Sequence, residues 1–91
     1  MSVQLTIPSS LTRYADGHSK FNLSGLSVAE VLDLLIEQHP DLKIRLRDER
    51  GNLYSYLPMF RNEEKLPLSG LDKVSVQDGD SLEIITLASG G

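Results

Sequence analysis

One segment of the sequence has apolar residues at the spacing of an amphipathic helix, whereas most other apolar residues follow strand-like patterns. Ser27 and Glu30 form a capping-box pattern at its start, and Pro40 prevents simple continuation beyond His39. The apolar residues that share one face of this predicted helix are Val28, Val31, Leu32, Leu35 and Ile36. A lone helix with one apolar face must cover a sheet, so the pattern favours an α+β fold.

Two strands are predicted before the helix. Apolar residues alternate with polar ones over residues 3–7, and this first strand ends at Pro8. A turn signal at Asp16-Gly17 precedes a second alternating segment, residues 20–24. We therefore expect a hairpin of adjacent strands at the start of the chain.

The C-terminal half predicts shorter and less regular strands. The expected segments are a third strand at residues 54–61, a turn at 62–65, an irregular strand at 66–68, a short extended piece at 74–76 and a last strand at 82–87. Pro58 has no N–H, so it must lie at an edge or a bulge. Ile84 and Leu87 break strict alternation, which is typical of a central strand buried on both faces.

Residues 41–47 fit two structures. Leu42, Ile44 and Leu46 alternate with polar residues as in a strand, whereas Leu42 and Leu46 also fit the i, i+4 spacing of a helix. We favour a short helical turn there, followed by a polar loop at residues 48–52.

The predicted elements occur in the order two strands, main helix, third strand, short strand and last strand. If the first and last strands pair in parallel at the centre of a mixed sheet, the intervening helix allows their connection. This is the β-grasp (ubiquitin-like) arrangement, in which a sheet wraps on one main helix. We expect a single β-grasp domain over residues 1–87 and a flexible tail at 88–91.

Composition excludes several classes of function. The 91 residues carry a net charge of -4, which disfavours nucleic acid and favours a basic partner surface. No apolar stretch approaches the roughly 20 residues of a membrane span, and the start lacks signal-peptide features, so we expect a cytoplasmic protein with no membrane partner. The absence of cysteine removes disulfides, thiolate metal sites and a cysteine nucleophile.

The chain contains no recognisable catalytic or metal-binding pattern. His18 and His39 are far apart in the sequence, and there is no glycine-rich phosphate loop or nucleophile elbow. Asp78-Gly79-Asp80 lacks the further acids of a calcium loop and favours a tight turn. We therefore predict no catalytic residue, no metal site and no bound cofactor, and hence a protein that is not an enzyme.

Folding leaves Gly90-Gly91, at the end of the sequence, unexplained. Residues without Cβ atoms are narrow and conformationally free, so they can thread a crevice in another protein and present a carboxylate there. A frayed terminus is the plain alternative. Tyr54, Tyr56 and Phe60 offer a further candidate, an exposed aromatic patch, although such residues more often pack in a small core.

Taken together, the β-grasp order, the closing segment 78–85 and Gly90-Gly91 resemble the MoaD/ThiS family of ubiquitin-like sulfur carriers. The likeness covers essentially the whole chain, and the Asp-Gly-Asp turn and the Gly-Gly carry most of its weight. The other matching positions are Ile7-Pro8, Val31, Leu32, Leu35, Gly51-Asn52-Leu53 and Asn62.

The resemblance implies that other proteins catalyse reactions at the carboxylate of Gly91. A MoeB/ThiF-like enzyme, which itself binds ATP and magnesium, would adenylate the Gly91 carboxylate. A sulfur donor protein or sulfide would then convert Gly91 to a thiocarboxylate, from which a sulfur-accepting biosynthetic enzyme takes the sulfur.

The resemblance also assigns roles to neighbouring residues. Gly90 would pass through a narrow channel of the partner, Ala88 and Ser89 would act as a spacer, and Leu87 would anchor the tail to the sheet. The residues expected to face the partner are Tyr56, Met59 and Phe60.

The resemblance is compatible with several pathways and functions. The extra stretch at residues 41–53 is more similar to carriers for cysteine or other amino-acid biosynthesis than to the shorter thiamine-pathway carriers. A molybdopterin synthase small subunit is the next alternative. A ubiquitin-like modifier joined to lysines through Gly91 is another, and so is an interaction domain with an inert tail. Pro58 departs from the family pattern, in which a polar residue such as Asn is common.

Overall fold

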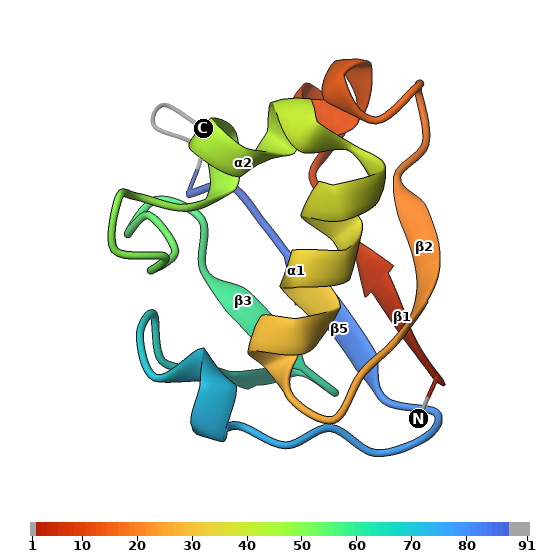
Figure 1. The fold of residues 1–91 in the computed structure, drawn as a ribbon, viewed down its shortest axis with the longest axis vertical. Helices are drawn as coiled ribbons and strands as arrows, with labels where there is room; N and C mark the ends of the chain where they lie inside the picture. Colours follow the sequence, from red (N-terminus) through yellow and green to blue (C-terminus); the bar gives the residue numbers. More distant parts are fainter. Residues whose placement is uncertain (1, 88–91) are drawn as a thin grey trace.

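The computed structural model describes residues 2–87 and places one main helix across one face of a mixed sheet (Figure 1). The strands are β1 (Ser2–Thr6), β2 (Lys20–Ser24), β3 (Met59–Arg61), β4 (Glu64–Lys65) and β5 (Ser81–Ile84). The helices are α1 (Val28–Gln38) and α2 (Lys43–Leu46), with the 3-10 turns η1 (Ser9–Tyr14), η2 (Pro40–Leu42) and η3 (Leu71–Lys73). The predicted α+β, β-grasp fold is confirmed.

The described strands form one sheet in the order β2-β1-β5-β3-β4. β1 and β5 are parallel neighbours at its centre, with Leu5 beside Leu82, as predicted. β2 pairs with β1 and β3 pairs with β5, both antiparallel. Since a tight hairpin cannot join parallel strands, the chain needs the intervening α1 to reach the second half of the sheet.

The main helix begins as its sequence predicts. Ser27 Oγ accepts a hydrogen bond from the Glu30 N–H at 3.2 Å, and the Glu30 carboxylate accepts one from the Leu26 N–H at 2.7 Å. The first bond satisfies a backbone donor that the first helical turn leaves without a partner, and the second holds the residue before the N-cap against the start of the helix. The buried helix residues are Val28, Val31, Leu32 and Leu35. They pack on one face of the sheet, whose buried residues include Val3, Leu5, Leu23, Met59, Leu82 and Ile84.

The connection between β1 and β2 is longer than the predicted hairpin. η1 and the turn after it separate the two strands, and Leu11 and Ala15 are buried there. The Asp16-Gly17 turn is present, with φ of 55° and 82°. It follows η1 and leads into β2, so it does not join β1 to β2 directly. The alternation rule identifies strands only, so it gave no sign of a 3-10 turn between them.

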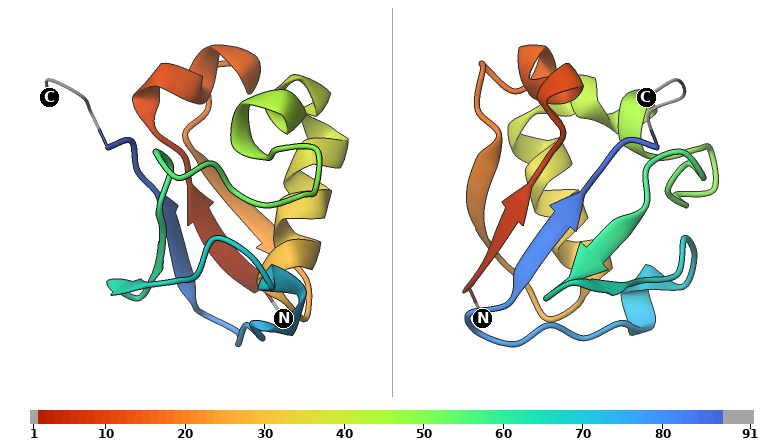
Figure 2. Two further views of the ribbon diagram at one scale, coloured as in Figure 1. Left: turned by 90° about the vertical axis from the view of Figure 1, so that its left-hand side faces the viewer. Right: turned by 180° about the vertical axis from the view of Figure 1, so that it is seen from behind.

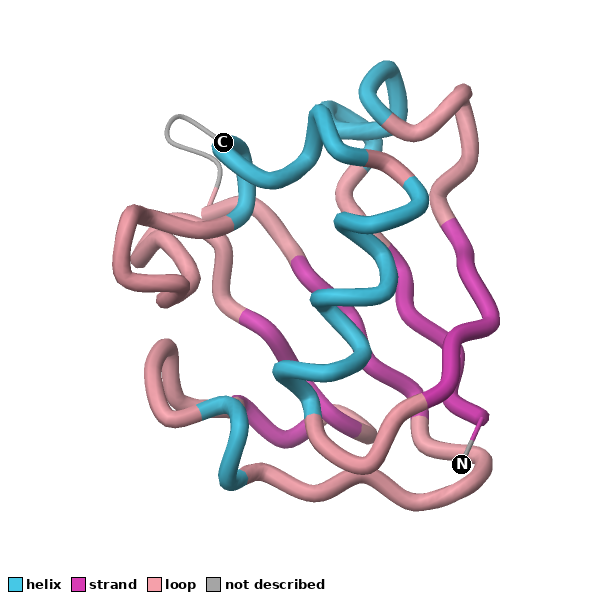
Figure 3. The backbone as a smooth tube through the Cα atoms, in the orientation of Figure 1, coloured by secondary structure: helices cyan, strands magenta, loops and turns pink. Residues whose placement is uncertain are grey.

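The third strand is shorter than predicted, and its hairpin partner lies in the predicted turn. Of the expected segment 54–61 only Met59–Arg61 is strand, and loop precedes it (Figure 3). Asn62 and Glu63 have φ of 49° and 74°, a conformation that suits a two-residue hairpin turn. Glu64–Lys65 can therefore pair with β3 as β4.

Two other expectations for this half also change. The predicted irregular strand at residues 66–68 is loop. In the extended piece at 74–76, Ser75 forms an isolated antiparallel bridge with Ser27 at the start of α1. This region therefore closes the end of the helix and adds no strand to the sheet.

The last strand is buried on one face only, so the expected two-sided strand was wrong. Leu82 and Ile84 are buried, whereas Ser81 and Glu83 are exposed. The helix covers a single face of the sheet (Figure 2), and the other face carries the alternate polar residues.

The helical alternative for residues 41–47 is confirmed. η2 and α2 follow α1 directly, with Leu42 and Leu46 buried and Ile44 exposed. Burial at an i, i+4 spacing is what one face of a helical turn provides.

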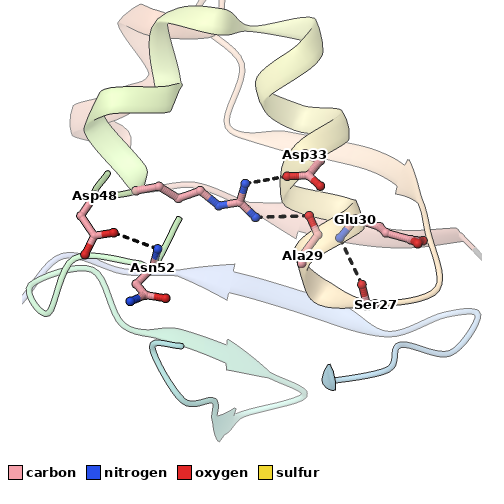
Figure 4. A network of polar contacts seen from close by, with 7 residues as sticks. Ser27, Ala29, Glu30, Asp33, Asp48 and Asn52 are labelled. Carbon is pink, nitrogen blue, oxygen red and sulfur yellow. Dashed lines mark hydrogen bonds and ion pairs between the residues drawn. The ribbon is translucent and has the colours of Figure 1, made fainter. Parts of the chain in front are cut away.

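Arg47 joins this second helix to the first. Its guanidinium donates to the Asp33 carboxylate at 2.6 Å and to the Ala29 carbonyl at 3.2 Å (Figure 4). In the loop that follows, the Asp48 carboxylate accepts from the Asn52 N–H at 3.0 Å. α2 is thereby held against the body of the domain.

The Asp-Gly-Asp turn ties the start of the chain to β5. Asp78 Oδ1 accepts from the Ser2 N–H at 2.9 Å, and the Gly79 N–H donates to the Ser2 carbonyl at 2.9 Å. Gly79 has a φ of 89°, which favours glycine. The motif thus has a structural role, in agreement with the tight turn predicted from the sequence.

Asp80 completes this turn with its side chain. Its carboxylate accepts from the Gln77 N–H at 2.8 Å and from the Asn62 amide at 3.1 Å. Asn62 Oδ1 in turn accepts from the Ser81 N–H at 3.0 Å. The bond from Gln77, and after it the bond from Asn62, favours the charged carboxylate and so lowers the pKa of Asp80.

Asp80→Ala is expected to lower the free energy of unfolding by about 1–2 kcal/mol near neutral pH, since it removes two bonds to a charged acceptor. Because the pKa of Asp80 is lower in the folded state, its contribution is present above the ordinary value of 3.8 and is lost as pH falls through the lower folded value. Urea unfolding across this acidic range measures the effect. Asp72→Ala, at an exposed carboxylate, is the control; equal losses in the two variants at every pH would contradict the assignment.

Candidate functional site

The strand that leads to the predicted tail points at one end of the domain. β5 runs toward the end where η1 and α2 lie (Figure 2). The predicted tail residues Ala88, Ser89, Gly90 and Gly91 lie outside the described residues. The described part of the candidate site is its root, the last residues before position 88.

Backbone hydrogen bonds hold this root. The Ile85 N–H donates to the Pro58 carbonyl and the Leu87 N–H donates to the Tyr56 carbonyl, each at 3.0 Å. Leu87 is thus bonded through its backbone to the loop before β3, and not to a strand of the sheet as expected, while its side chain is 59% exposed. Pro58, which has no N–H to donate, contributes its carbonyl to this pairing.

A groove of about 560 Å³ lies beside the root, and we call it the tail groove. η1, α2 and residues 56–57 and 86–87 line it. Five of its lining residues carry an aromatic, a charged or an exposed large apolar side chain: Tyr14, Ile44, Arg45, Tyr56 and Leu87. The groove thus joins segments that are far apart in the sequence.

Aromatic contacts fix two sides of the tail groove. The Arg45 guanidinium lies 3.6 Å from the centre of the Tyr14 ring, a cation–π contact between α2 and η1. Tyr54 and Tyr56 stack with ring centres 5.3 Å apart, and the Tyr54 hydroxyl donates to the Ile44 carbonyl at 2.8 Å. The loop before β3 is thereby attached to α2.

The three residues predicted to face a partner differ in their exposure. Tyr56 is exposed, at 48%, and lines the tail groove. Met59 is fully buried and packs in the core, so its placement on a partner surface was wrong. Phe60 is half-buried and pairs with Glu83, which puts it on the solvent-facing side of the sheet, away from the core.

Sequence reasoning missed three of these five side chains of the tail groove, namely Tyr14, Ile44 and Arg45. Tyr14 lies in the unpredicted η1, and Ile44 and Arg45 lie in the segment whose structure was open between helix and strand. One usable signal was present, because the helical alternative puts Ile44 on the face opposite Leu42 and Leu46 and so predicts its exposure.

Neither a metal-ligand cluster nor a membrane-spanning helix occurs among the described residues. Across positions 2–87, no three His, Asp or Glu side chains come together as metal ligands would. No helix within that range is both long enough and apolar enough to cross a membrane. This end of the molecule holds residues 85–87 in place beside a groove that apolar side chains and Arg45 line.

A profile of the ThiS family matches residues 10–91, nearly the whole chain. The chain belongs to the ThiS family. The predicted likeness to MoaD/ThiS ubiquitin-like carriers is thus confirmed, and the match includes the segment at 41–53 as well as Gly90 and Gly91.

Individual relatives are similar over their whole length. The sulfur carrier protein CysO of Mycobacterium tuberculosis is 28% identical over 93 residues, and the alignment covers 100% of both proteins. In a structure of the Amycolatopsis orientalis BexX/CysO complex, one chain is 30% identical with a TM-score of 0.86, over 98% of this ThiS-family chain and 99% of that one. The small archaeal modifier protein 1 of Methanosarcina acetivorans is 28% identical with a TM-score of 0.78, over 99% and 96% of the two chains.

Proposed function

We propose that this ThiS-family chain is a sulfur carrier, activated at the carboxylate of Gly91. The observation that carries the proposal is the likeness to the sulfur carrier CysO over 100% of both sequences. The geometry supports it, because the root of the segment that leads to Gly91 is held by Pro58 and Tyr56 at the edge of an open groove.

The chemistry requires activation by another protein. A carboxylate is a poor acyl donor because its oxide is a poor leaving group. Attack of the Gly91 carboxylate on the α-phosphate of ATP releases pyrophosphate and gives an acyl-adenylate, and attack by hydrosulfide then expels AMP and leaves a thiocarboxylate. ATP and magnesium bind to a MoeB/ThiF-like partner, so the carrier acts as a substrate and not as an enzyme.

The sulfur then passes to a biosynthetic enzyme, and we propose cysteine or another amino acid as its destination. In support, the CysO relatives align with the whole chain, including the stretch at 41–53 that favoured this branch in the sequence. A sulfur donor protein or sulfide supplies the atom, since the chain has no cysteine of its own.

Intact-mass analysis of the protein isolated from its own cells tests the proposal. The expected result is a species heavier by the exchange of one oxygen for sulfur, located at Gly91 by fragmentation. Incubation with ATP, the cognate adenylating enzyme and a sulfide source should increase this species, whereas omission of ATP should not. A free carboxylate alone after the complete incubation would contradict the sulfur-carrier proposal.

A ubiquitin-like modifier is the second candidate, favoured by the likeness to the archaeal modifier protein. The two candidates share the adenylation step and differ in the nucleophile that follows, a lysine amine in place of sulfide. The same mass analysis separates them, because a modifier gives branched peptides in which Gly91 is bound to lysines of other proteins.

A further inference from the structure

We propose that the tail groove is the docking site for the partner that adenylates Gly91, and that it takes a partner segment in which an apolar side chain lies next to a carboxylate. This inference rests on the proposed function. It adds the surface that the partner contacts and the chemistry of the contacting segment.

The distance from the groove to Gly91 limits where the partner can sit. Leu87 lines the groove, and its N–H bond to Tyr56 is the last backbone anchor in the described part of the chain. Four residues from Leu87 to Gly91 span at most about 14 Å when fully extended. A partner with Gly91 in its catalytic site therefore lies over or beside the tail groove.

The exposed apolar side chains gather at this end. Among residues 2–87 four large hydrophobic side chains are exposed: Leu26, Ile44, Tyr56 and Leu87. Ile44, Tyr56 and Leu87 line the tail groove, whereas Leu26 precedes α1 at the opposite end of that helix from α2. An apolar cluster with a polar surround is the usual mark of a protein interface.

The charge of the groove specifies the partner. Arg45 is the charged residue among its lining residues, which include no Asp or Glu. In the described part of the chain the ion pairs are Arg47 with Asp33 and His39 with Asp16, so Arg45 has no carboxylate partner there. The net charge of -4 favours a basic partner overall, but this surface is locally positive and matches an acidic segment.

The cation is held in place before the partner arrives. Arg45 Nη1 donates to the Asp41 carbonyl at 3.1 Å while the guanidinium lies over the Tyr14 ring. An arginine held in this way loses less side-chain entropy when it binds a carboxylate, and its planar fork suits a bidentate contact. A partner carboxylate paired with Arg45 would sit beside the apolar wall that Ile44 and Tyr56 form.

The test compares matched variants of the full chain in ATP–pyrophosphate exchange by the ThiF-like adenylating enzyme of the same organism. Ile44→Ser is paired with Leu26→Ser, because the two side chains are 69% and 67% exposed. Arg45→Glu is paired with Lys43→Glu, which makes the same charge change on α2 at a residue that lines a different hollow. Arg45→Gln removes the charge without reversing it, and thermal unfolding confirms that each variant is folded.

We expect Ile44→Ser and Arg45→Glu to raise KM for the carrier about tenfold or more, with kcat nearly unchanged, because they weaken binding before and during the reaction equally. The two controls should change KM by less than about twofold, and Arg45→Gln should lie between Arg45→Glu and the unaltered carrier. Exchange with the same KM for groove and control variants would overturn the docking site alone. An Arg45→Glu carrier that binds as well as the unaltered one would overturn the acidic segment. No exchange with the unaltered carrier would overturn the proposed function and this inference with it.

Discussion

Deletion of Gly91 is expected to abolish adenylation by the cognate enzyme while the free energy of unfolding stays the same. The deletion leaves a carboxylate on Gly90, which stops about 3.5 Å short of the position that Gly91 reaches. A displacement of this size removes the carboxylate from attack distance of the α-phosphate, and misplacement by 1 Å alone can cost about 100-fold. ATP–pyrophosphate exchange measures the loss.

Stability should not follow activity in this variant. The core and the anchoring bonds of the root, Ile85 to Pro58 and Leu87 to Tyr56, lie within residues 2–87 and keep all their atoms. Urea unfolding of the deletion variant therefore measures the structural contribution of Gly91 directly. Ser89→Ala, which keeps the length of the chain, is the control and should keep its activity. A deletion variant that unfolds easily would favour a structural tail, and one that is still adenylated would remove Gly91 from the mechanism.

The parts of the fold that depend on local pattern were predictable. Ser27, Glu30 and the apolar stripe after them specify a capped helix with one buried face, and the structure has both the cap bonds and the burial. The parallel pairing of β1 with β5 was also predictable, because few arrangements let one helix cover all the apolar strands.

The parts that depend on contacts between distant segments were not predictable. The tail groove brings Tyr14, Arg45, Tyr56 and Leu87 together from four segments, and no local pattern in any one of them indicates the others. The turn between β3 and β4 needs positive φ at both Asn62 and Glu63. Asn suits the first position, but Glu stands at the second, where Gly is the usual signal, so the sequence did not indicate the hairpin of β3 and β4.

Met59 and Phe60 show why the sequence placed a buried residue, Met59, on the predicted partner surface. Adjacent residues in a strand point to opposite faces, so only the pairing register decides which of the two is buried. The register aligns Met59 with the buried Ile84 and Phe60 with the exposed Glu83. From the sequence both were assigned to the partner surface, which no regular strand allows for neighbours.

Met59→Ala should therefore act on stability, with a loss of about 2–5 kcal/mol in the free energy of unfolding. Its side chain has 0% exposure in the core, so truncation removes buried apolar contacts and leaves a cavity. Met59→Leu, which nearly conserves volume, should cost less than about 1.5 kcal/mol. Phe60→Ala, on the solvent-facing side, should cost less than Met59→Ala because its ring is only half-buried.

Urea unfolding with linear extrapolation gives these free energies. Adenylation is measured at urea concentrations below the unfolding midpoint, where each variant is folded, so a raised KM there reports docking and not folding. Folded Met59→Ala should be adenylated with the KM of the unaltered chain, because the side chain it loses does not reach the surface. A stable Met59→Ala variant with a raised KM would return Met59 to the partner surface and contradict the register of β3. A KM that rises for Phe60→Ala alone would instead extend the docking surface from the tail groove onto the open face of the sheet, since Phe60 lies there beside Glu83.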